Sequence, residues 1–214
     1  MSNLENYMKR QAIFCEQNDS ISKNLYSEYG VKRGLRDEKG QGVLTGLTNI
    51  SDIKAFEYHD GVKSPCDGEL SYRGYNIKDL VTGSKGKRFV FEEGAYLLLF
   101  GELPTDTQLM EFQGRLSDCM ELPTNFTRDV IMKAPTSDIM GSMTRSILTL
   151  GSYDKEKESL EIPNVLRQSM QLIAVFPMLA VYAYHAYCHY EKTKVCIFID
   201  LKKIYLLLKI SCAY

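Results

Sequence analysis

Residues 163–190 read PNVLRQSMQLIAVFPMLAVYAYHAYCHY, and this stretch decides the fold class. Pro163 suits the first turn of a helix, and a helix over the whole stretch would be about 28 residues, or roughly 42 Å, long. From Leu172 to Tyr184 the pattern is apolar almost all round, which predicts burial against several neighbours or a second subunit. Pro177 removes one backbone donor, so we expect a kink there.

Helical patterns also occur on the N-terminal side of this stretch. Tyr7, Ile13 and Phe14 are spaced for one face of a helix within the first thirty residues. Gly30 suits the left-handed stop after a second, short helix, and Gly101 has the same position behind Phe100. The expected further helices cover about residues 22–29, 92–100, 105–122 and 137–151.

Two of these helices begin with capping signals. Thr105 followed by Gln108 is a capping-box pattern, and Pro123 should stop the helix that it starts. Ser137 can cap the next helix, which should end at Gly151. The predicted apolar stripes are Leu109, Phe112 and Leu116 on the first helix, and Ile139, Met140, Met143, Ile147 and Leu148 on the second.

The sequence from Gly34 to Gly86 has a different texture, in which glycines alternate with β-forming residues. Val43–Ile50 and Glu69–Tyr75 are predicted as short strands joined by tight turns. The fold class predicted from these patterns is therefore mainly α, with a small β-hairpin region near residues 42–75.

Composition limits the possible partners. Lys and Arg number 26 against 27 Asp and Glu, for a net charge of −1, which argues against nucleic acid or an anionic membrane as the main partner. The 44% hydrophobic and 25% charged content is that of a folded globular chain. The longest apolar run, Leu172–Tyr184, is shorter than the roughly 18 residues that a membrane span needs, so we expect no membrane segment.

The six cysteines include no Cys-x-x-Cys pair. The first residues, MSNLEN, have neither the basic nor the apolar region of a secretory signal. Reduced thiols and a cytoplasmic location are therefore expected.

One cluster invites a metal-site interpretation. His185 and His189 are spaced to share a helix face, with Cys188 beside them. A zinc site needs three or four ligands with oriented partners, and His59 is the only other histidine in the chain. Histidines at the polar end of a mostly buried helix are the favoured interpretation, and no metal site is predicted.

Other short motifs also fail as sites. The Gly83–Arg88 stretch lacks the spacing of a phosphate loop, and Gly40-x-Gly42 lacks the third glycine of a dinucleotide fingerprint. The acidic pairs Asp37–Glu38 and Glu92–Glu93 have sufficient structural explanations, the second at a helix start.

Three stretches together resemble consecutive blocks of bacterial citrate synthases, in family order. They are residues 33–51 (RGLRDEKGQGVLTGLTNIS), 68–80 (GELSYRGYNIKDL) and 91–104 (FEEGAYLLLFGELP). The resemblance covers roughly Leu25 to Lys192, and it includes the helix that contains Arg145. It implies a mainly helical fold with a large and a small domain, and a homodimer built from antiparallel helices. The predicted helices at 137–151 and 163–190 would belong to that interface.

The family's chemistry condenses acetyl-CoA with oxaloacetate and releases citrate and CoA. The resemblance implies an aspartate base, two histidines that polarise the reactants and arginines that hold the carboxylates, all in motifs of the family's second half. His59, His185 and His189 match none of these motifs. The sequence therefore predicts no catalytic, cofactor-binding or metal-binding residue in this chain. Acetyl-CoA is expected only as a co-substrate of the intact enzyme.

The expected division of the chain is 1–192, the N-terminal part of the citrate synthase large domain, and 193–214, a tail read out of frame in a truncated chain. A basic amphipathic helix around Lys202, Lys203 and Lys209 is the alternative for the tail. Two alternatives to a citrate synthase fragment stay open. One is a non-catalytic helical dimerisation module, and the other is a fragment of a 2-methylcitrate synthase that uses propionyl-CoA. Oxaloacetate, acetyl-CoA and a second copy of the chain are the expected partners.

Overall fold

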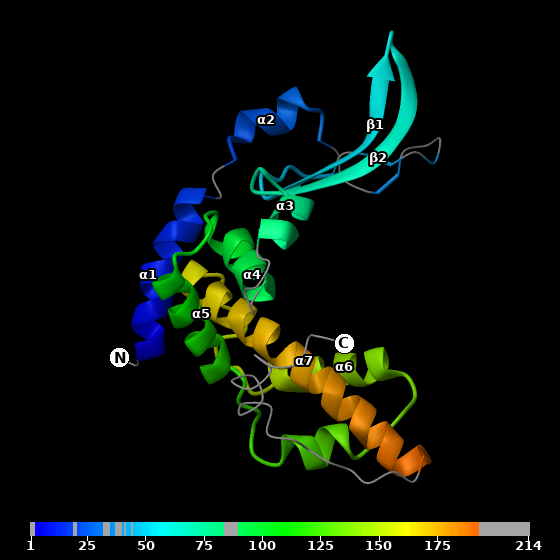
Figure 1. The fold of residues 1–214 in the computed structure, drawn as a ribbon. Helices are drawn as coiled ribbons and strands as arrows, with labels where there is room; N and C mark the ends of the chain where they lie inside the picture. The colour runs from blue at the N-terminus through cyan, green and yellow to red at the C-terminus, as the bar shows by residue number, and fades with distance from the viewer. Residues whose placement is uncertain are drawn as a thin grey trace. The chain divides into compact units, whose positions relative to one another are not determined.

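The computed structural model describes residues 3–18, 21–31, 35–36, 40, 42–43, 45–83 and 90–192. Helices dominate these residues, with one small antiparallel sheet, which confirms the predicted mainly α fold class (Figure 1). The chain forms two compact units, one of Met1–Ala12 with Met110–Tyr214 and one of Ile13–Leu109. The elements are α1 (Asn3–Asn18), α2 (Lys23–Glu28), β1 (Ser51–His59), β2 (Val62–Tyr72), β3 (Tyr75–Asn76), α3 (Ile77–Gly83), α4 (Val90–Phe100), α5 (Asp106–Asp118), the π-helical turn η1 (Thr127–Ile131), α6 (Ile139–Gly151) and α7 (Ile162–Lys192).

The buried face of α1 differs from the predicted one. Tyr7 is buried as expected, but Ile13 and Phe14 are exposed. The other buried residues of the helix lie one, four and five positions after Tyr7, which is the spacing of a single helical face. Ile13 falls outside that face, and Phe14 lies two turns past Tyr7, beyond the buried stretch. The predicted apolar stripe was therefore wrong for both residues.

The sheet of the second unit is a hairpin with a short third strand. β1 pairs antiparallel with β2 from Ser51 opposite Tyr72 to His59 opposite Val62. The turn between them has positive φ at both Asp60 (50°) and Gly61 (82°), as a two-residue hairpin loop of type I′ requires. Figure 1 shows this hairpin as a curved ribbon.

The hairpin begins later in the sequence than predicted. Glu69–Tyr75 lies in β2, the following turn and β3, so strand structure there is confirmed. The strand predicted over Val43–Ile50 is wrong for the described residues of that stretch, which form no strand, and the neighbouring Gly42 forms only an isolated bridge with Arg36. The physical reason is pairing: β1 has a continuous antiparallel partner from Ser51 onward, whereas the described residues before it make only isolated backbone bonds, such as the one from the Arg73 N–H to the Ile50 carbonyl. The helix α3, directly after β3, was not predicted.

The signals at the end of α4 and the start of α5 are confirmed, but α5 ends at Asp118, five residues before the predicted stop at Pro123. Gly101 follows α4 with φ of 85°, the left-handed conformation expected of a stop residue. The Gln108 backbone N–H donates to the Thr105 hydroxyl over 3.3 Å, and the Thr105 N–H donates to the Gln108 side-chain oxygen over 2.8 Å. These two bonds form the reciprocal capping box. Phe112 and Leu116 of the predicted stripe are fully buried.

The start of α6 differs by one residue from the prediction. Asp138, not Ser137, is the N-cap, and its Oδ1 accepts a hydrogen bond of 2.9 Å from the Gly141 backbone N–H. A carboxylate in this position satisfies a free helix N–H group and also interacts favourably with the helix dipole. The C-terminal end of α6 at Gly151 is as predicted.

The long predicted helix is confirmed as α7, with Pro163 as its second residue and Pro177 inside it. The helix packs against α6 and η1 within its unit, and Met170, Val175 and Leu179 are among its most buried side chains. Burial does not extend all round, because Leu172 and Phe176 on the same helix are about 40% exposed.

By length and composition, α7 is also apolar enough to cross a membrane. The uninterrupted apolar run in this helix is too short to span a membrane, but the mean hydropathy over 18 residues stays high despite a few scattered polar residues. One third of that window is buried inside the chain, and the core helix of a soluble protein meets the same criterion. The expectation of no membrane partner stays a prediction.

Candidate functional site

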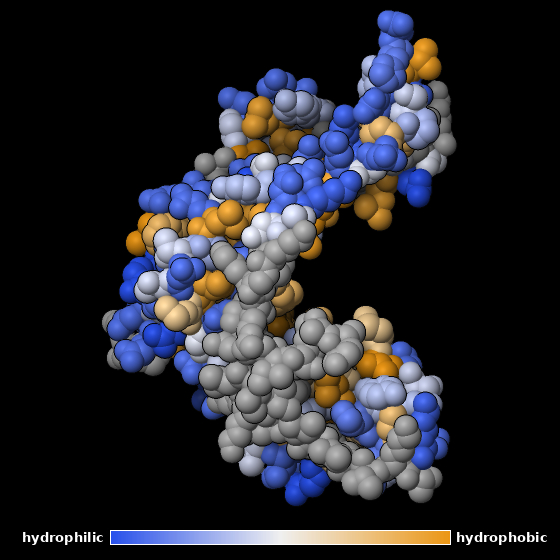
Figure 2. All heavy atoms as spheres, viewed as in Figure 1, coloured by the Kyte–Doolittle hydropathy of each residue, from blue (hydrophilic) through white to orange (hydrophobic). Residues whose placement is uncertain are grey.

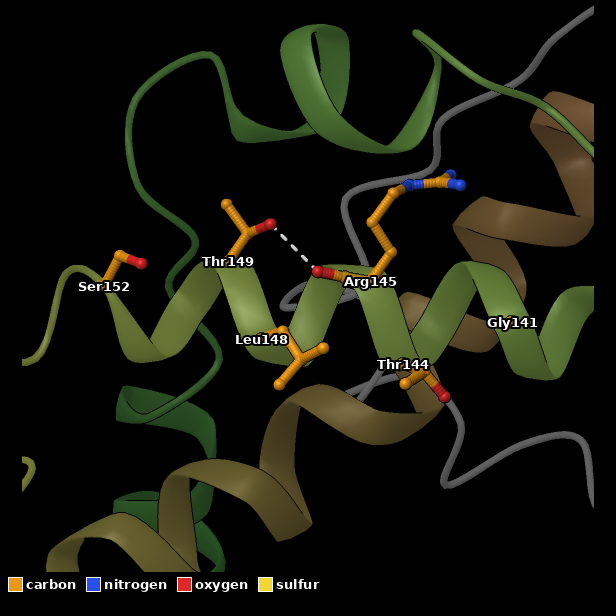
Figure 3. Close-up of a pocket in the computed structure, with 6 residues that line it drawn as sticks. All are labelled: Gly141, Thr144, Arg145, Leu148, Thr149 and Ser152. Carbon is orange, nitrogen blue, oxygen red and sulfur yellow. Dashed lines mark hydrogen bonds between the residues drawn. The ribbon is translucent and has the colours of Figure 1, made fainter.

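One side of α6 has a shallow hollow at its surface. It is a shallow depression of about 560 Å³ lined by Gly141, Thr144, Arg145, Leu148, Thr149 and Ser152 (Figure 3). All of these residues belong to α6 or its C-cap, so the surface is one side of a single helix and not an enclosed pocket. Such a surface is suited to contact with another element, and it has no enclosure for a small ligand.

Arg145 is the one charged residue that lines this surface. Its Nη2 donates to the Ala134 carbonyl over 2.9 Å and to the Ser142 hydroxyl over 3.3 Å. Its Nε is buried with no hydrogen-bond partner within the described part of the chain. The guanidinium thus fastens the segment before α6 to the helix. The sequence resemblance included Arg145 without giving it a role, and the contacts show a structural one.

Large apolar side chains of α6 and α7 are exposed. Met140 is 72% and Leu148 is 73% exposed on α6, and Leu172, Phe176 and Tyr184 are exposed on α7. We call these five residues the α6/α7 apolar set. Figure 2 shows hydrophobic residues at the surface over the region of α6. Whereas α6 was predicted to have one wide apolar face, the residues it buries are Met143 and the small Ser142 and Ser146.

A polar network joins the start of α7 to the loop that precedes it. Arg167 Nη2 donates to both carboxylate oxygens of Asp154, over 2.8 and 2.9 Å. The amide of Asn164, which is buried, donates to the Glu156 and Ser159 carbonyls over 2.8 and 3.0 Å. A cavity of about 390 Å³ lies beside this network and is lined also by the start of α1. The network holds the loop before α7 against the helix. Because Arg167 and Asn164 use these side-chain donors within the chain, few donors are left to bind a ligand.

Cys119 and Asp154 of this unit are among the groups with shifted pKa values. Burial raises the pKa of the Cys119 thiol to about 11, and the nearby Asp118 charge adds to the effect. At neutral pH this thiol is protonated, so it is a poor nucleophile. For Asp154, burial alone would raise the pKa. Hydrogen bonds from Gln168, Arg167 and the Glu156 backbone, with the Arg167 charge, lower it further than burial raises it.

The histidine and cysteine cluster does not form a metal site. Within the described residues, no three His, Cys, Asp or Glu side chains meet as metal ligands would, so His185, Cys188 and His189 are not such a group. Cys188 is buried, and the His185 ring lies edge-on to Tyr184. His59 is exposed on β1, 3.2 Å from Glu57 through Nε2. The absence of a metal from the whole chain stays a prediction.

The other motifs that the sequence analysis rejected as sites lie only partly within the described residues. Gly83 ends α3, but residues 84–88 lie outside the described residues, as do Asp37 and Glu38. Gly40 accepts a hydrogen bond of 2.8 Å from Arg36 Nη1 through its carbonyl, which is a turn contact. Glu92 is buried in the first turn of α4. The tail 193–214 is likewise outside the described residues, so both interpretations of it stay predictions.

Comparison with known proteins assigns the family. A family model described as "Citrate synthase, C-terminal domain" matches residues 35–198. A citrate synthase of Saccharolobus solfataricus is 30% identical over 154 residues, which are 72% of this chain and 35% of that protein. A 2-methylcitrate synthase of Shewanella oneidensis is 34% identical over 116 residues, 54% of this chain and 28% of that protein. The chain belongs to the citrate synthase family.

A solved structure agrees with this assignment. The citrate synthase of Pyrobaculum aerophilum aligns with a TM-score of 0.55 and 26% identity, over 75% of this chain and 41% of that one. The chain spans about a third of the length of the curated relatives named above. The family match ends at residue 198, six residues past the predicted boundary at Lys192.

Proposed function

We propose that this chain is the scaffold part of an enzyme that condenses acetyl-CoA with oxaloacetate and water to give citrate and CoA, the entry reaction of the tricarboxylic acid cycle. The observation that carries the proposal is the family match over residues 35–198. The Shewanella oneidensis relative supports a second candidate, 2-methylcitrate synthesis from propionyl-CoA.

The chain's own contribution in this proposal is structure and subunit contact. The α6/α7 apolar set would be covered by a second copy in a homodimer, because removing exposed apolar side chains from water is favourable. The catalytic aspartate and histidines that the resemblance implies would come from sequence that this chain does not contain. A non-catalytic dimerisation module would use the same surface.

A thiol-release assay tests the placement of the catalytic groups. The 214-residue chain is incubated with acetyl-CoA or propionyl-CoA, with and without oxaloacetate, beside a full-length citrate synthase as the positive control. We expect no oxaloacetate-dependent release of CoA by this chain. Turnover above the uncatalysed rate would contradict the proposal that its catalytic groups lie elsewhere, and the preferred acyl-CoA would then separate the two syntheses.

Genomic sequencing past the codon for Lys192 tests the enzymatic part. A further reading frame that encodes His- and Asp-bearing citrate synthase motifs is the expected result. A locus without such a continuation would contradict the enzymatic proposal and would favour a stand-alone dimerisation module.

A further inference from the structure

The last carbonyl groups of α4 accept hydrogen bonds from side chains that are distant in the sequence. The final carbonyls of a helix have no partners within the helix, so other groups must satisfy them. The carbonyls are those of Leu98, Leu99 and Phe100, and the donors are, in the same order, Arg73 Nη2 (3.1 Å), the Cys15 thiol (3.4 Å) and Asn18 Nδ2 (3.1 Å). Two of these donors come from α1 and the third from the turn between β2 and β3, so the end of α4 joins the sheet to α1.

Arg73 contacts the ends of two helices at once. While its Nη2 bonds to α4, its Nη1 donates to the carbonyl of Asn18, the last residue of α1, over 3.1 Å. The C-terminal end of a helix carries partial negative charge, so a guanidinium shared by two such ends interacts favourably with both. The Arg73 backbone N–H also donates to the Ile50 carbonyl, directly before β1, over 2.7 Å. Arg73 therefore holds the base of the hairpin to two helices.

The backbone of Arg73 has a conformation that glycine adopts more easily. Arg73 and Gly74 form the two-residue turn between β2 and β3, and their φ angles are 49° and 85°. Positive φ is uncommon for a residue with a side chain, so Arg73 carries a conformational cost. The turn itself does not require an arginine. The contacts of the guanidinium are what offset this cost.

The hairpin has little other support. Among the described elements, β1 packs mainly against β2. Ile53 and Tyr58 lie on opposite faces of β1 and are 71% and 69% exposed, so neither face is covered at these positions within the described residues. A two-stranded hairpin on its own is at best marginally stable in water. The stability of this hairpin therefore depends on how its base is attached.

We propose that Arg73 is a clamp that holds the β1/β2 hairpin to the ends of α1 and α4, and that the hairpin opens as one unit when the clamp releases. Release breaks the bonds of the guanidinium to Asn18 and Leu98, and the hairpin then lacks the attachment that keeps its strands ordered. Segments with few packing contacts open in this cooperative way without unfolding the rest of a protein. The clamp is independent of the enzymatic function proposed above, because Arg73 has no role in it.

Hydrogen exchange of Arg73→Gly tests the clamp, because the turn and the clamp make opposite predictions for this variant. Glycine removes the conformational cost, so the turn alone predicts hairpin amides that exchange no faster than in wild type. The clamp predicts that the amides of β1 and β2 exchange at least about tenfold faster, the factor expected from losing even one hydrogen bond of a charged group. The exchange rates of α7, which lies in the other unit, should not change.

Asp60→Gly is the matched control. It is the same change at the first position of the turn between β1 and β2, at an exposed residue with φ of 50°, and it should not speed the exchange of the hairpin amides. Arg73→Lys keeps the charge but lacks the planar fork that reaches two carbonyls, so it should speed hairpin exchange by less than Arg73→Gly does. Hairpin amides that exchange no faster in Arg73→Gly than in wild type would overturn the proposal. A rise of equal size in α7, or a wild-type hairpin without protection, would overturn it too.

Discussion

Asp154 shows how one residue stabilises the start of α7. Its carboxylate accepts hydrogen bonds from Arg167, Gln168 and the Glu156 backbone over 2.8 to 3.0 Å. Because the pKa of Asp154 in the folded chain is lower than its usual value, the unfolded chain binds the proton more readily. The contribution to stability is therefore complete above about pH 4, the unfolded pKa, and is lost as pH falls through the folded pKa.

Replacing Asp154 with Asn removes this pH-dependent contribution. We expect Asp154→Asn to lower the free energy of unfolding at pH 7 by about 1–3 kcal/mol, because Arg167 loses its charged partner. Urea unfolding at pH 7 and near pH 3 measures the effect, and the difference between variant and wild type should shrink in acid. Asp67→Asn, at an exposed position, is the control. An equal difference at both pH values would contradict the assignment.

Gly101 is required by both conformation and space. Its φ is 85°, and a Cβ there would lie 2.6 Å from Cγ of Asn18. We expect Gly101→Ala to destabilise the chain by about 1–3 kcal/mol in thermal or urea unfolding. Gly114, inside α5 with open space around it, is the matched control. Gly114→Ala should instead stabilise by about 0.5–1 kcal/mol, and a loss of stability at both positions would contradict this account.

Among the helices, the N-cap of α6 gives different predictions for the adjacent residues Ser137 and Asp138. Asp138→Ala removes the side-chain acceptor for the Gly141 N–H and should cost about 1 kcal/mol of stability. Ser137→Ala, one residue earlier, should change the free energy of unfolding by less than about 0.5 kcal/mol. Chemical denaturation of both variants decides between them. A larger loss of stability from Ser137→Ala than from Asp138→Ala would contradict this assignment and indicate that Ser137 is the cap, as the sequence predicted.

Which elements could be predicted from sequence depends on where their stabilising contacts lie. The left-handed conformation of Gly101 and the Thr105 capping box were predictable, because each depends on hydrogen bonds within four residues, whereas the close approach of Asn18 to Gly101 was not. Ser137 and Asp138 are both good caps, so only the geometry separates them. The exposed side of α6 was not predictable, since the burial of Leu148 depends on what packs against it. The candidate site was likewise not predictable. The sequence predicted no catalytic residue in this chain, and it did not predict the depression along α6.

For the whole molecule, we propose that α6 and α7 form a contact between copies of the chain. The α6/α7 apolar set is the structural basis, with Leu148 among its most exposed members. Burying exposed apolar surface is worth about 25 cal/mol per Å², so a charge placed within the contact would be costly to cover. In the separated chain, by contrast, a charge at Leu148 stays in water and should leave the fold intact.

Sedimentation equilibrium of Leu148→Glu beside wild type tests the proposed contact through α6 and α7. Leu160→Glu is the matched control, the same substitution at an 87% exposed leucine in the loop between α6 and α7. We predict that wild type and Leu160→Glu associate with the same weight-average mass. Leu148→Glu should have a lower mass with an unchanged helical circular dichroism spectrum. A monomeric wild type, or a Leu148→Glu variant that associates as wild type does, would contradict the account.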